Sequence, residues 1–528
     1  MPARSTTVLL LFAAALPCQT ANAPLTPKQL DELRTRAYAA EQSHRFADAA
    51  AAFVALARAE PDRADWLVAA GRCLGQSGQF RAAVDLLDAG RKRFPGLVEV
   101  AAMLARTFVL QAELDRGVLQ PEVLWTDAVD LAEGVLAVDP NHEDSALVLA
   151  QARYQLGQWD KAVAAAEEAV RRHPGRAGAH MLLGRIAGDR LRALLKRHAD
   201  EQPTGQAAAD LVGQIDAQRQ LARKSYGEAA RLDPTRPRPH TALGELAWLD
   251  RRPDEARNHF ADALAVDPDA PIDHDALWAG QGWEARAAFY AAVRHRYAAT
   301  TNAQPAKAAT LRFHEGRARS DGGEWQAART CLAEALAGNP AATNAHFYLF
   351  LCAYNLGDHD AAELHGATYA ALGAPTFADV IRGLAGDRRG QVGAVVEFLA
   401  NRAFASKHIE ASRDLNHVIA CLKDSADAWN NHALLCRDTG RFDDALASYQ
   451  HAMEKEPDSP QLLNDTGVIL HYHLRSPANA QKARELYGRA VRLAEAQLAD
   501  DRLQGAARER VARAKDDALA NLKELGGK

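Results

Sequence analysis

The sequence has few aromatic residues, few methionines and no large cluster of charge of one sign. Aromatic residues make up 6% of its 528 positions and methionine occurs 4 times, although apolar residues reach 48%. Alanine dominates the apolar content, and it is the strongest helix former and small enough to let helices approach closely. Valine and isoleucine are dispersed and form no alternating runs of the kind that strands show. The composition predicts an all-α chain.

The sequence also lacks a basic surplus and a long internal apolar stretch. Its 63 lysines and arginines nearly balance 68 aspartates and glutamates, which leaves a formal net charge of −5. Nucleic-acid binding needs clustered positive charge, so no nucleic-acid partner is expected. A membrane-spanning helix needs about 20 mostly apolar residues, and no stretch after the N-terminal leader meets that requirement. We therefore expect no integral membrane span.

Sequence patterns of catalytic and metal sites are missing as well. There is no Gly-x-Ser-x-Gly elbow, no phosphate loop ending in Gly-Lys-Ser/Thr and no His-Glu-x-x-His motif. His471 and His473 are two positions apart, and on a helix such side chains point in different directions. The sequence therefore predicts no catalytic residue, no cofactor and no metal site.

Residues 1–23 have the parts of a secretory signal peptide. A short basic start precedes the apolar run Val8–Leu16, and an Ala-Asn-Ala site follows at residues 21–23. The run is too short to span a bilayer, so it predicts a protein that is exported to the periplasm or secreted. Cys18 leaves a lipoprotein anchor open as the less favoured alternative, because Leu16 and Pro17 before it do not resemble a lipidation site.

Five cysteines follow the leader: Cys73, Cys331, Cys352, Cys421 and Cys436. An odd number leaves at least one thiol unpaired in an oxidising compartment. Their spacing matches no zinc or haem motif, so we interpret them as small buried hydrophobic residues. A disulfide between Cys331 and Cys352 on neighbouring helices stays open as an alternative.

The feature that the sequence does contain is a repeat of 34 residues. Prolines close successive units, and three gaps between neighbouring prolines measure 34 residues; the prolines are Pro61, Pro95, Pro140, Pro174, Pro234, Pro268, Pro340 and Pro457. Alanine stands 12 positions before every one of them, and large residues recur 8 and 15 positions before most. Glycine often stands 17 or 24 positions before. Such a period is typical of a solenoid of stacked helix pairs.

Each recurring position has a physical interpretation. The glycine 17 residues before the proline ends the first helix of a pair, where a left-handed conformation is needed. Small residues allow the two helices to cross closely, and the large residue 8 positions before the proline fills the space between them. The proline stops the second helix. One pair cannot bury its apolar face alone, so neighbouring pairs must stack.

These linked positions resemble the tetratricopeptide repeat family. The clearest unit runs from Ala426 to Pro457, and the unit from Pro237 to Pro268 is nearly as good. The resemblance covers about residues 29–500, with interruptions. It implies an all-α superhelical solenoid of roughly 10–12 stacked antiparallel helix pairs. It also implies that the chain binds protein or peptide partners as a scaffold, like exported bacterial-type members of the family.

The interruptions of the repeat suggest how the chain is divided. The expected parts are a signal peptide at 1–23, an N-terminal repeat block at 29–268 with an insert at 188–216, a degenerate linking segment at 269–305, a C-terminal repeat block at 306–500 that is degenerate at 376–424, and a capping helix at 501–528. The insert is expected to extend a helix pair, with a break at Pro203-Thr204-Gly205. A weaker unit ends near Pro375.

The resemblance implies a binding groove, because the first helix of each pair usually lines the concave surface in this family. The spacing places ten residues there: Arg72, Tyr154, Trp248, Phe313, Phe347, Tyr354, Asn430, Arg437, Asn464 and His471. Aromatic and arginine side chains are common anchors of protein interfaces. The alternative is that about half of them pack against neighbouring helices. Asn431 stands at a ladder position, but Tyr348 and Asp465 occupy the matching places, so no peptide class is carried over.

Three functions remain open at this point. The leading hypothesis is a non-catalytic scaffold outside the cytoplasm that binds proteins or peptides in cell-envelope assembly or secretion. The alternative is an enzyme or a small-molecule binder with its site in the degenerate segments 271–305 or 376–424. The third is an architectural protein that polymerises end to end. The charged C-terminal helix disfavours the third, because it covers the last repeat face.

Overall fold

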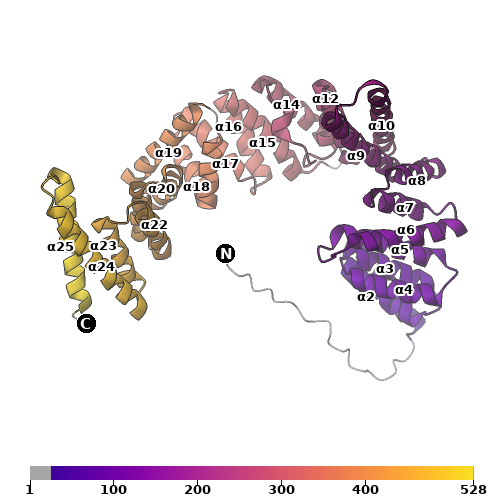
Figure 1. The fold of residues 1–528 in the computed structure, drawn as a ribbon, viewed down its shortest axis with the longest axis horizontal. Helices are drawn as coiled ribbons and strands as arrows, with labels where there is room; N and C mark the ends of the chain where they lie inside the picture. Colours follow the sequence, from indigo (N-terminus) through magenta and orange to yellow (C-terminus); the bar gives the residue numbers. More distant parts are fainter. Residues whose placement is uncertain (1–24, 302, 385, 527–528) are drawn as a thin grey trace. The chain divides into compact units, whose positions relative to one another are not determined.

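The computed structural model describes residues 25–301, 303–384 and 386–526. Every regular element in these residues is a helix, and consecutive helices pack as pairs (Figure 1). The prediction of an all-α helix-pair solenoid is therefore confirmed. The helices form two compact units, Met1–Ala263 and Leu264–Lys528, which we describe one at a time. The predicted leader, residues 1–23, lies outside the described residues.

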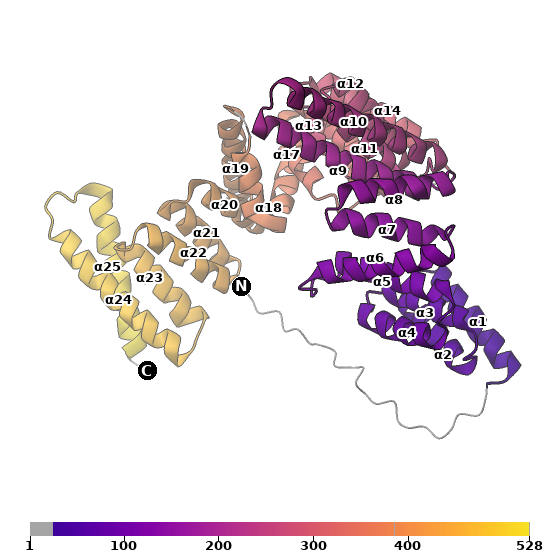
Figure 2. The same ribbon diagram turned by 45° about the vertical axis from the view of Figure 1, so that its right-hand side comes forward.

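The first unit is built from helices α1 to α12. Their bounds are α1 (Pro27–Gln42), α2 (Phe46–Ala59), α3 (Ala64–Gln76), α4 (Phe80–Arg93), α5 (Val98–Leu114), α6 (Pro121–Val138), α7 (Glu143–Gln155), α8 (Trp159–Arg172), α9 (Ala177–Glu201), α10 (Gly205–Leu232), α11 (Pro237–Leu249) and α12 (Pro253–Val266). Figure 2 shows the helices from α1 to α8 stacked in chain order. Odd-numbered helices are the first members of their pairs in this unit.

The second unit is built from helices α13 to α25. Their bounds are α13 (His274–Leu277), α14 (Trp283–Ala298), α15 (Pro305–Asp321), α16 (Trp325–Gly338), α17 (Asn344–Asn355), α18 (His359–Arg382), α19 (Arg388–Ala405), α20 (Ile409–Lys423), α21 (Ala426–Asp438), α22 (Phe442–Lys455), α23 (Pro460–Val468), α24 (Pro477–Leu498) and α25 (Gly505–Gly526). A π-helical turn, Ile469–His473, continues α23. Within the described residues of this unit, α13 is a single helical turn, α14 packs on α15, and the helices from α15 to α24 form five pairs followed by α25.

The repeated prolines and glycines set the helix ends as the sequence predicts. The second helix of each proline-closed unit ends two residues before its proline, as α2 does at Ala59 and α22 at Lys455. The glycines 17 positions before a proline adopt left-handed backbone angles, with φ between 69° and 78°; they are Gly78, Gly157, Gly323 and Gly440. Glycine accepts this conformation without the steric cost of a Cβ atom.

A second kind of glycine lets the two helices of a pair approach closely. Gly184 on α9 faces the ring of Tyr226 on α10, and a Cβ atom at Gly184 would lie 2.6 Å from the ring atom Cδ1. Tyr226 is buried, and it packs in a cluster with Ala187, Leu191 and Leu243. The ring therefore has little room to move away, and only glycine fits beneath it.

Gly184→Ala is expected to lower the free energy of unfolding of the first unit by about 1–3 kcal/mol. Overpacking a filled core has this cost, and it outweighs the gain of about 1 kcal/mol that alanine brings to a helix interior. Gly227→Ala on α10 is the matched control, because a Cβ atom there meets nothing within 4 Å. Urea unfolding followed by circular dichroism should show opposite shifts of the midpoint. Equal shifts in the two variants would contradict the packing argument.

Two pairs depart from the regular repeat. The insert 188–216 extends α9 and α10, which run to 25 and 28 residues and are separated by the non-helical residues 202–204. Helix α18 continues past Pro375, where the sequence suggests the end of a unit, and reaches Arg382. Its backbone leaves the helical conformation at Gly373, so α18 consists of two helical segments joined at a kink. The first segment thus ends about two residues before Pro375, as the second helices of the other proline-closed units do, and a further helical segment follows it up to Arg382.

The last helix covers the end of the second unit. α25 packs on α23 and α24, and Asn521 on α25 donates a hydrogen bond of 3.0 Å to Asn464 on α23. Leu463 and Leu470 are buried in the same cluster as Ala518 of α25. The apolar face that the last pair would otherwise expose is therefore partly covered by a helix whose other side carries charge.

Two further observations concern the whole described chain. Cys73, Cys331, Cys352, Cys421 and Cys436 are free thiols, and all but Cys421 are buried. Among the described residues, no helix combines the length and the apolar character that crossing a bilayer requires.

Candidate functional site

All ten residues predicted for the groove lie on the first helix of a pair or on the π-helical turn that continues α23. Seven of them are half-buried, namely Arg72, Tyr154, Phe313, Tyr354, Asn430, Arg437 and His471. Trp248 is exposed. Phe347 and Asn464 are buried, with 2% and 4% of their surfaces exposed. All ten thus lie on first helices or their continuation, but their exposure differs from residue to residue.

Phe347 and Asn464 are corrections to the predicted groove. Phe347 on α17 packs edge-on against Phe377, with ring centroids 5.7 Å apart, because the continuation of α18 beyond its kink covers that face. Asn464 accepts the hydrogen bond from Asn521 of the covering helix α25. Neither side chain is available to a partner in this structure. The causes are two helical segments whose packing the repeat pattern does not encode.

A groove of the first unit lies along the first helices of three successive pairs. It has a volume of about 540 Å³ and is lined by residues of α5, α7 and α9, together with the start of α11. Its large apolar lining residues are Val109, Leu110, Leu147, Val148, Met181 and Leu182. Five arginines and only two aspartates line it: Arg106, Arg176, Arg185, Arg236, Arg238, Asp144 and Asp233. We call this surface the arginine groove.

The repeat register places the polar residues of the arginine groove. Arg106, Gln151 and Arg185 each stand 11 residues after the proline that closes the preceding unit, and so does Arg72 in the pair before them. Counting forward from a proline reaches the first helix before any insertion occurs. Of these four residues, only Arg72 is among the ten that were predicted for the groove. Of the groove's arginines, sequence reasoning therefore missed all five, although this forward count would have found two.

Hydrogen bonds join these side chains from one repeat to the next. Arg106 pairs with Asp144 of the following repeat at 3.2 Å, and Arg176 pairs with the same carboxylate at 2.9 Å. Gln151 donates to Glu113 at 2.7 Å and accepts a hydrogen bond from Arg185. Arg106 and Asp144 remain more than a third exposed, so solvent and ligands can reach this pair.

Tyr154 contacts an arginine of the arginine groove and lies one helical turn after Gln151 on α7. The guanidinium of Arg185 lies over its ring at 5.3 Å from the centroid, an arrangement that favours a cation. Its hydroxyl hydrogen-bonds to Asp189. Burial and this hydrogen bond raise the pKa of Tyr154 to about 12, so the hydroxyl stays protonated at neutral pH. Tyr154 holds the Arg185 side chain in place beside the groove.

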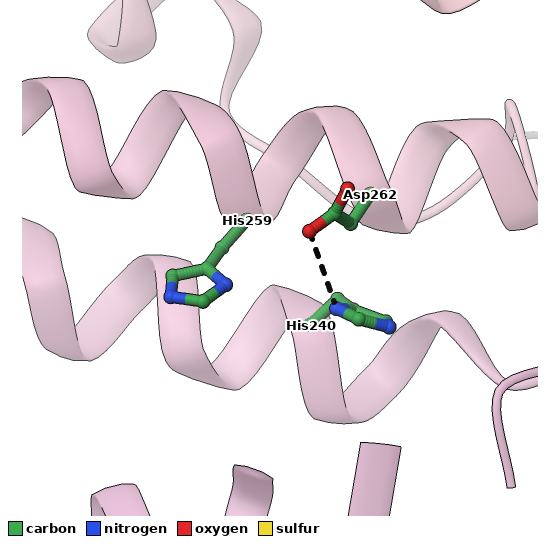
Figure 3. Close-up of side chains that lie close together, drawn as sticks. All are labelled: His240, His259 and Asp262. Atoms are coloured by element: carbon green, nitrogen blue, oxygen red, sulfur yellow. Dashed lines mark ion pairs between the residues drawn. The ribbon is translucent and has the colours of Figure 1, made fainter. Parts of the chain in front are cut away.

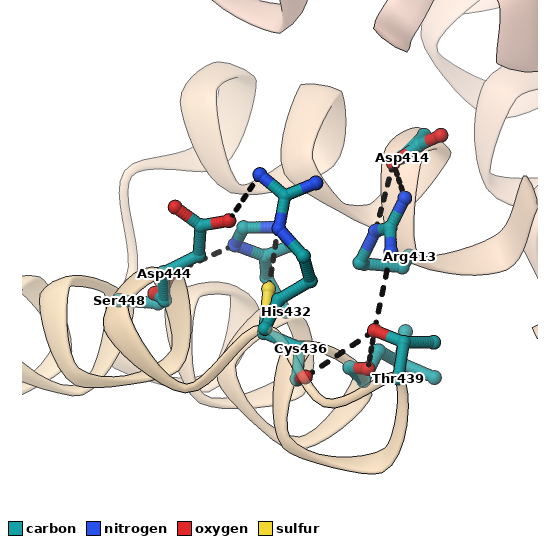
Figure 4. A network of polar contacts seen from close by, with 9 residues as sticks. Arg413, Asp414, His432, Cys436, Thr439, Asp444 and Ser448 are labelled. Carbon is teal, nitrogen blue, oxygen red and sulfur yellow. Dashed lines mark hydrogen bonds and ion pairs between the residues drawn. The ribbon is translucent and has the colours of Figure 1, made fainter. Parts of the chain in front are cut away.

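The second unit contains a smaller polar niche between α18, α20, α21 and α22. Its volume is about 380 Å³, and its lining includes Arg413, His417, His432, Arg441 and Asp444. Figure 4 shows His432 between the side chains of Cys436 and Ser448. The distance from Nδ1 of His432 to Oγ of Ser448 is 2.9 Å, and that from Nε2 to Sγ of Cys436 is 3.3 Å.

The hydrogen bonds determine where the proton of His432 lies. Ser448 donates its hydroxyl proton to the carbonyl oxygen of Asp444 at 2.8 Å. Its oxygen must therefore accept from Nδ1–H of His432, which leaves Nε2 as the acceptor for the thiol of Cys436. In the same niche, the guanidinium of Arg413 donates one hydrogen bond of 2.8 Å to Asp414 and another of 3.2 Å to Thr439 (Figure 4).

The Cys436–His432 pair is held in its neutral form. Burial, together with the nearby His417, Arg413 and Arg441, lowers the pKa of His432 to about 3. Burial and the carboxylate of Asp444 raise the pKa of Cys436 to about 12. An activated thiolate needs shifts in the opposite directions. The geometry thus resembles a nucleophile–base pair, whereas the electrostatics favour a packed, neutral hydrogen-bond chain.

The two degenerate segments differ in what they contribute. Segment 376–424 supplies Arg413, Asp414 and His417 to the niche. Segment 271–305 forms a packed cluster in which His274 and Tyr290 hydrogen-bond at 2.7 Å. Burial lowers the pKa of His274 and raises that of Tyr290, so both side chains are neutral at neutral pH.

Comparisons with known proteins identify the repeat. Two family models, both described as tetratricopeptide repeat, match residues 40–107 and 125–186 and residues 313–375 and 430–492. No curated protein sequence matches the chain.

The similar solved structures include two that are described as tetratricopeptide repeat proteins. TTC0263, a thermophilic tetratricopeptide repeat protein of Thermus thermophilus, is 24% identical, with 45% of this chain and 97% of that chain covered and a TM-score of 0.28. A tetratricopeptide repeat protein of Parabacteroides merdae is 11% identical, with 61% of this chain and 98% of that chain covered and a TM-score of 0.31. MamA of Desulfovibrio magneticus is 16% identical, with 37% of this chain and 96% of that chain covered and a TM-score of 0.27.

The matched segments, the proline and glycine register and the stacked helix pairs agree with one another. Repeats of this kind indicate a protein-interaction scaffold. Residues 40–107, 125–186, 313–375 and 430–492 of this chain are tetratricopeptide repeats.

Proposed function

We propose that the protein is a non-catalytic scaffold that holds an extended, acidic segment of a partner protein in the arginine groove. The observation that carries the proposal is the groove's lining, in which five arginines and two aspartates surround an apolar floor. A carboxylate-bearing peptide with apolar side chains complements both features, because guanidinium groups bind carboxylates in a bidentate manner.

The exposure of the arginines supports an acidic ligand. Arg238 is exposed at the start of α11, and Arg106 keeps 37% of its side-chain surface exposed. Asp144 faces both Arg106 and Arg176, so one carboxylate already shows how these guanidinium groups can be bridged. A second carboxylate brought by a partner would add hydrogen bonds to the same array.

We further propose that this binding takes place outside the cytoplasm, in cell-envelope assembly or secretion. The support is the leader-like sequence at residues 1–23, with its apolar run Val8–Leu16 and its Ala-Asn-Ala site. The partner is then a protein that is itself exported.

The proposal is tested by site-specific photo-crosslinking of the full chain in its native host. A photoreactive amino acid replaces Leu147, a partly exposed residue of the groove floor. Arg238→Glu and the double variant Arg106→Glu/Arg238→Glu are expected to reduce the yield of the crosslinked partner at least 10-fold, which is about 1.4 kcal/mol of binding energy. Rising salt should weaken capture in the same way.

The matched control is Arg81→Glu on α4, which makes the same charge change at an exposed position outside the groove. It should leave the crosslink intact, and circular dichroism should be the same for all variants. A crosslink of unchanged yield in Arg106→Glu/Arg238→Glu would show that the arginines do not bind the partner.

A small-molecule role is the second candidate, and the niche beside His432 is the observation that favours it. Its volume of about 380 Å³ lies within the range of ligand pockets, and two arginines and three histidines are among its lining residues. The groove variants leave this niche unchanged. A cellular defect that appears in niche variants but not in groove variants would therefore favour the small-molecule function.

A further inference from the structure

Two histidines and an aspartate of the last helix pair of the first unit converge on one point. His240 lies on α11, and His259 and Asp262 lie on α12. One potential ligand atom from each residue lies within 4.8 Å of the other two. Figure 3 shows both rings and the carboxylate facing the space between the two helices. The sequence predicts no metal site, because His240 is 19 residues away from His259 and only the packing of the pair brings them together.

The helix pair holds these three side chains on rigid elements. His259 and Asp262 are three positions apart, so they lie on the same face of α12. The face of α11 is brought close by Gly244, where a Cβ atom would lie 2.5 Å from the ring of Phe260. This close approach sets the distance between the two helices at the point where His240 reaches across. Ligands on packed helices lose little conformational entropy on binding.

The electrostatics of the cluster favour a cation. Nδ1 of His240 lies 3.8 Å from Oδ2 of Asp262, too long for a hydrogen bond and close enough for an ion pair. Nδ1 of His259 is buried and has no hydrogen-bond partner among the described residues. A buried nitrogen lone pair or N–H group without a partner is costly unless something binds it. The carboxylate of Asp262 is 37% exposed, which leaves a route from solvent.

We propose that His240, His259 and Asp262 bind a divalent transition-metal ion of the zinc class. Two imidazole nitrogens and one carboxylate oxygen are a donor set that zinc, cobalt and nickel prefer, whereas calcium and magnesium require oxygen ligands. Zinc–nitrogen and zinc–oxygen bonds of about 2.0–2.2 Å require the ligand atoms to draw closer by small side-chain rotations. Three protein ligands leave a fourth position, which water or a side chain of a bound partner fills.

The ion would fasten α11 to α12 at the end of the first unit. It needs both histidines in the neutral form, so the site competes directly with an ion pair between a protonated His240 and Asp262. This ion pair is the alternative that uses the same atoms and no metal. The metal site and the ion pair can be distinguished, because only the metal site makes the full chain bind an ion in a way that requires all three residues.

The test is a titration of the full chain with Zn²⁺ and with Co²⁺, followed by calorimetry and by the visible absorption of bound cobalt. One equivalent of metal ion per chain is expected to bind at His240, His259 and Asp262. His259→Ala, His240→Ala and Asp262→Asn should each weaken that equivalent at least about 100-fold, because loss of a direct ligand costs no less than loss of an outer hydrogen-bond partner. His198→Ala on α9 is the matched control, since this histidine lies outside the cluster.

Other histidines of the chain can also bind metal ions, and the three cluster variants distinguish that binding from binding at the cluster. His346 and His365 in the second unit have Nδ1 atoms 3.0 Å apart, and any ion that they bind is unaffected by changes at His259. Zinc should also raise the melting temperature of the first unit in the wild type and not in His259→Ala. Identical stoichiometry and affinity in the wild type and all three cluster variants would overturn the proposal and leave the ion pair as the role of these residues.

Discussion

Glu315→Ala is expected to lower the free energy of unfolding of the unit Leu264–Lys528 by about 3–5 kcal/mol. Only 4% of the Glu315 side chain is exposed, and its carboxylate meets three guanidinium groups. The partners are Arg294 at 3.3 Å, Arg312 at 3.3 Å and Arg319 at 3.1 Å. Removing the carboxylate leaves the three cations close together without their common counter-charge, which is far more costly than losing an exposed ion pair.

The measurement is calorimetric unfolding, in which the transition of this unit is followed in each variant. Glu334→Ala is the matched control, because Glu334 pairs with the same Arg312 at 2.6 Å but is 48% exposed. Its loss should cost no more than about 1 kcal/mol. Similar losses in the two variants would show that burial does not set the strength of this ion network.

Acidification from pH 6.5 to pH 4.5 is expected to destabilise the same unit strongly. Burial lowers the pKa of His432 to about 3 and also lowers that of His417, whose ring stacks on it at 4.3 Å between centroids. The unfolded chain then binds more protons than the folded chain below the ordinary histidine pKa of 6.5. Stability therefore falls as the pH falls through this window, by about 1.4 kcal/mol per pH unit for His432 alone, and the loss levels off near pH 3.

The groups around His432 make this titration sensitive to single changes. Arg413 and Arg441 oppose a positive charge on the ring, and the thiol of Cys436 occupies its one free nitrogen. His432→Gln is expected to flatten the pH dependence of the unfolding midpoint by about 1.4 kcal/mol per pH unit, even if it lowers stability at pH 7.

His451→Gln is the control for this variant, because His451 borders the same niche but has half of its side chain exposed. It should leave the slope unchanged. Urea unfolding at pH 7, 6, 5 and 4.5, followed by circular dichroism, gives the slopes. A wild-type slope that His432→Gln does not reduce would mean that His432 protonates without unfolding the unit.

The helices were predictable because their signals are local. A proline two residues past a helix and a glycine with positive φ act within one turn, so Pro61 or Gly78 has the same effect wherever its unit stands in the chain. One contact between the two helices of a pair was also predictable. Leu87 and Phe260 each stand 8 positions before a proline. Leu87 fills the space above Gly71, and Phe260 fills the space above Gly244.

The exposure of the residues assigned to the groove did not follow from the repeat pattern, because exposure depends on which helix comes next. Tyr154 and Arg72 lie on first helices and are half-buried, as a groove residue can be. Phe347 was assigned to the groove by the same spacing, yet the kinked continuation of α18 covers it. A kink at Gly373 changes the direction of a helix, and the repeat pattern contains no information on that direction.

The sequence by itself determined the all-α repeat, the ends of most helices and the first helices on which a groove would be lined, since each of these depends on neighbours within about one repeat. Only the tertiary structure decided which side chains meet. The five arginines of one groove come from three helices and the caps between them, and His240 reaches His259 and Asp262 across a helix pair. Such meetings depend on insertions, on helix directions and on the distance between packed helices, which no single repeat specifies.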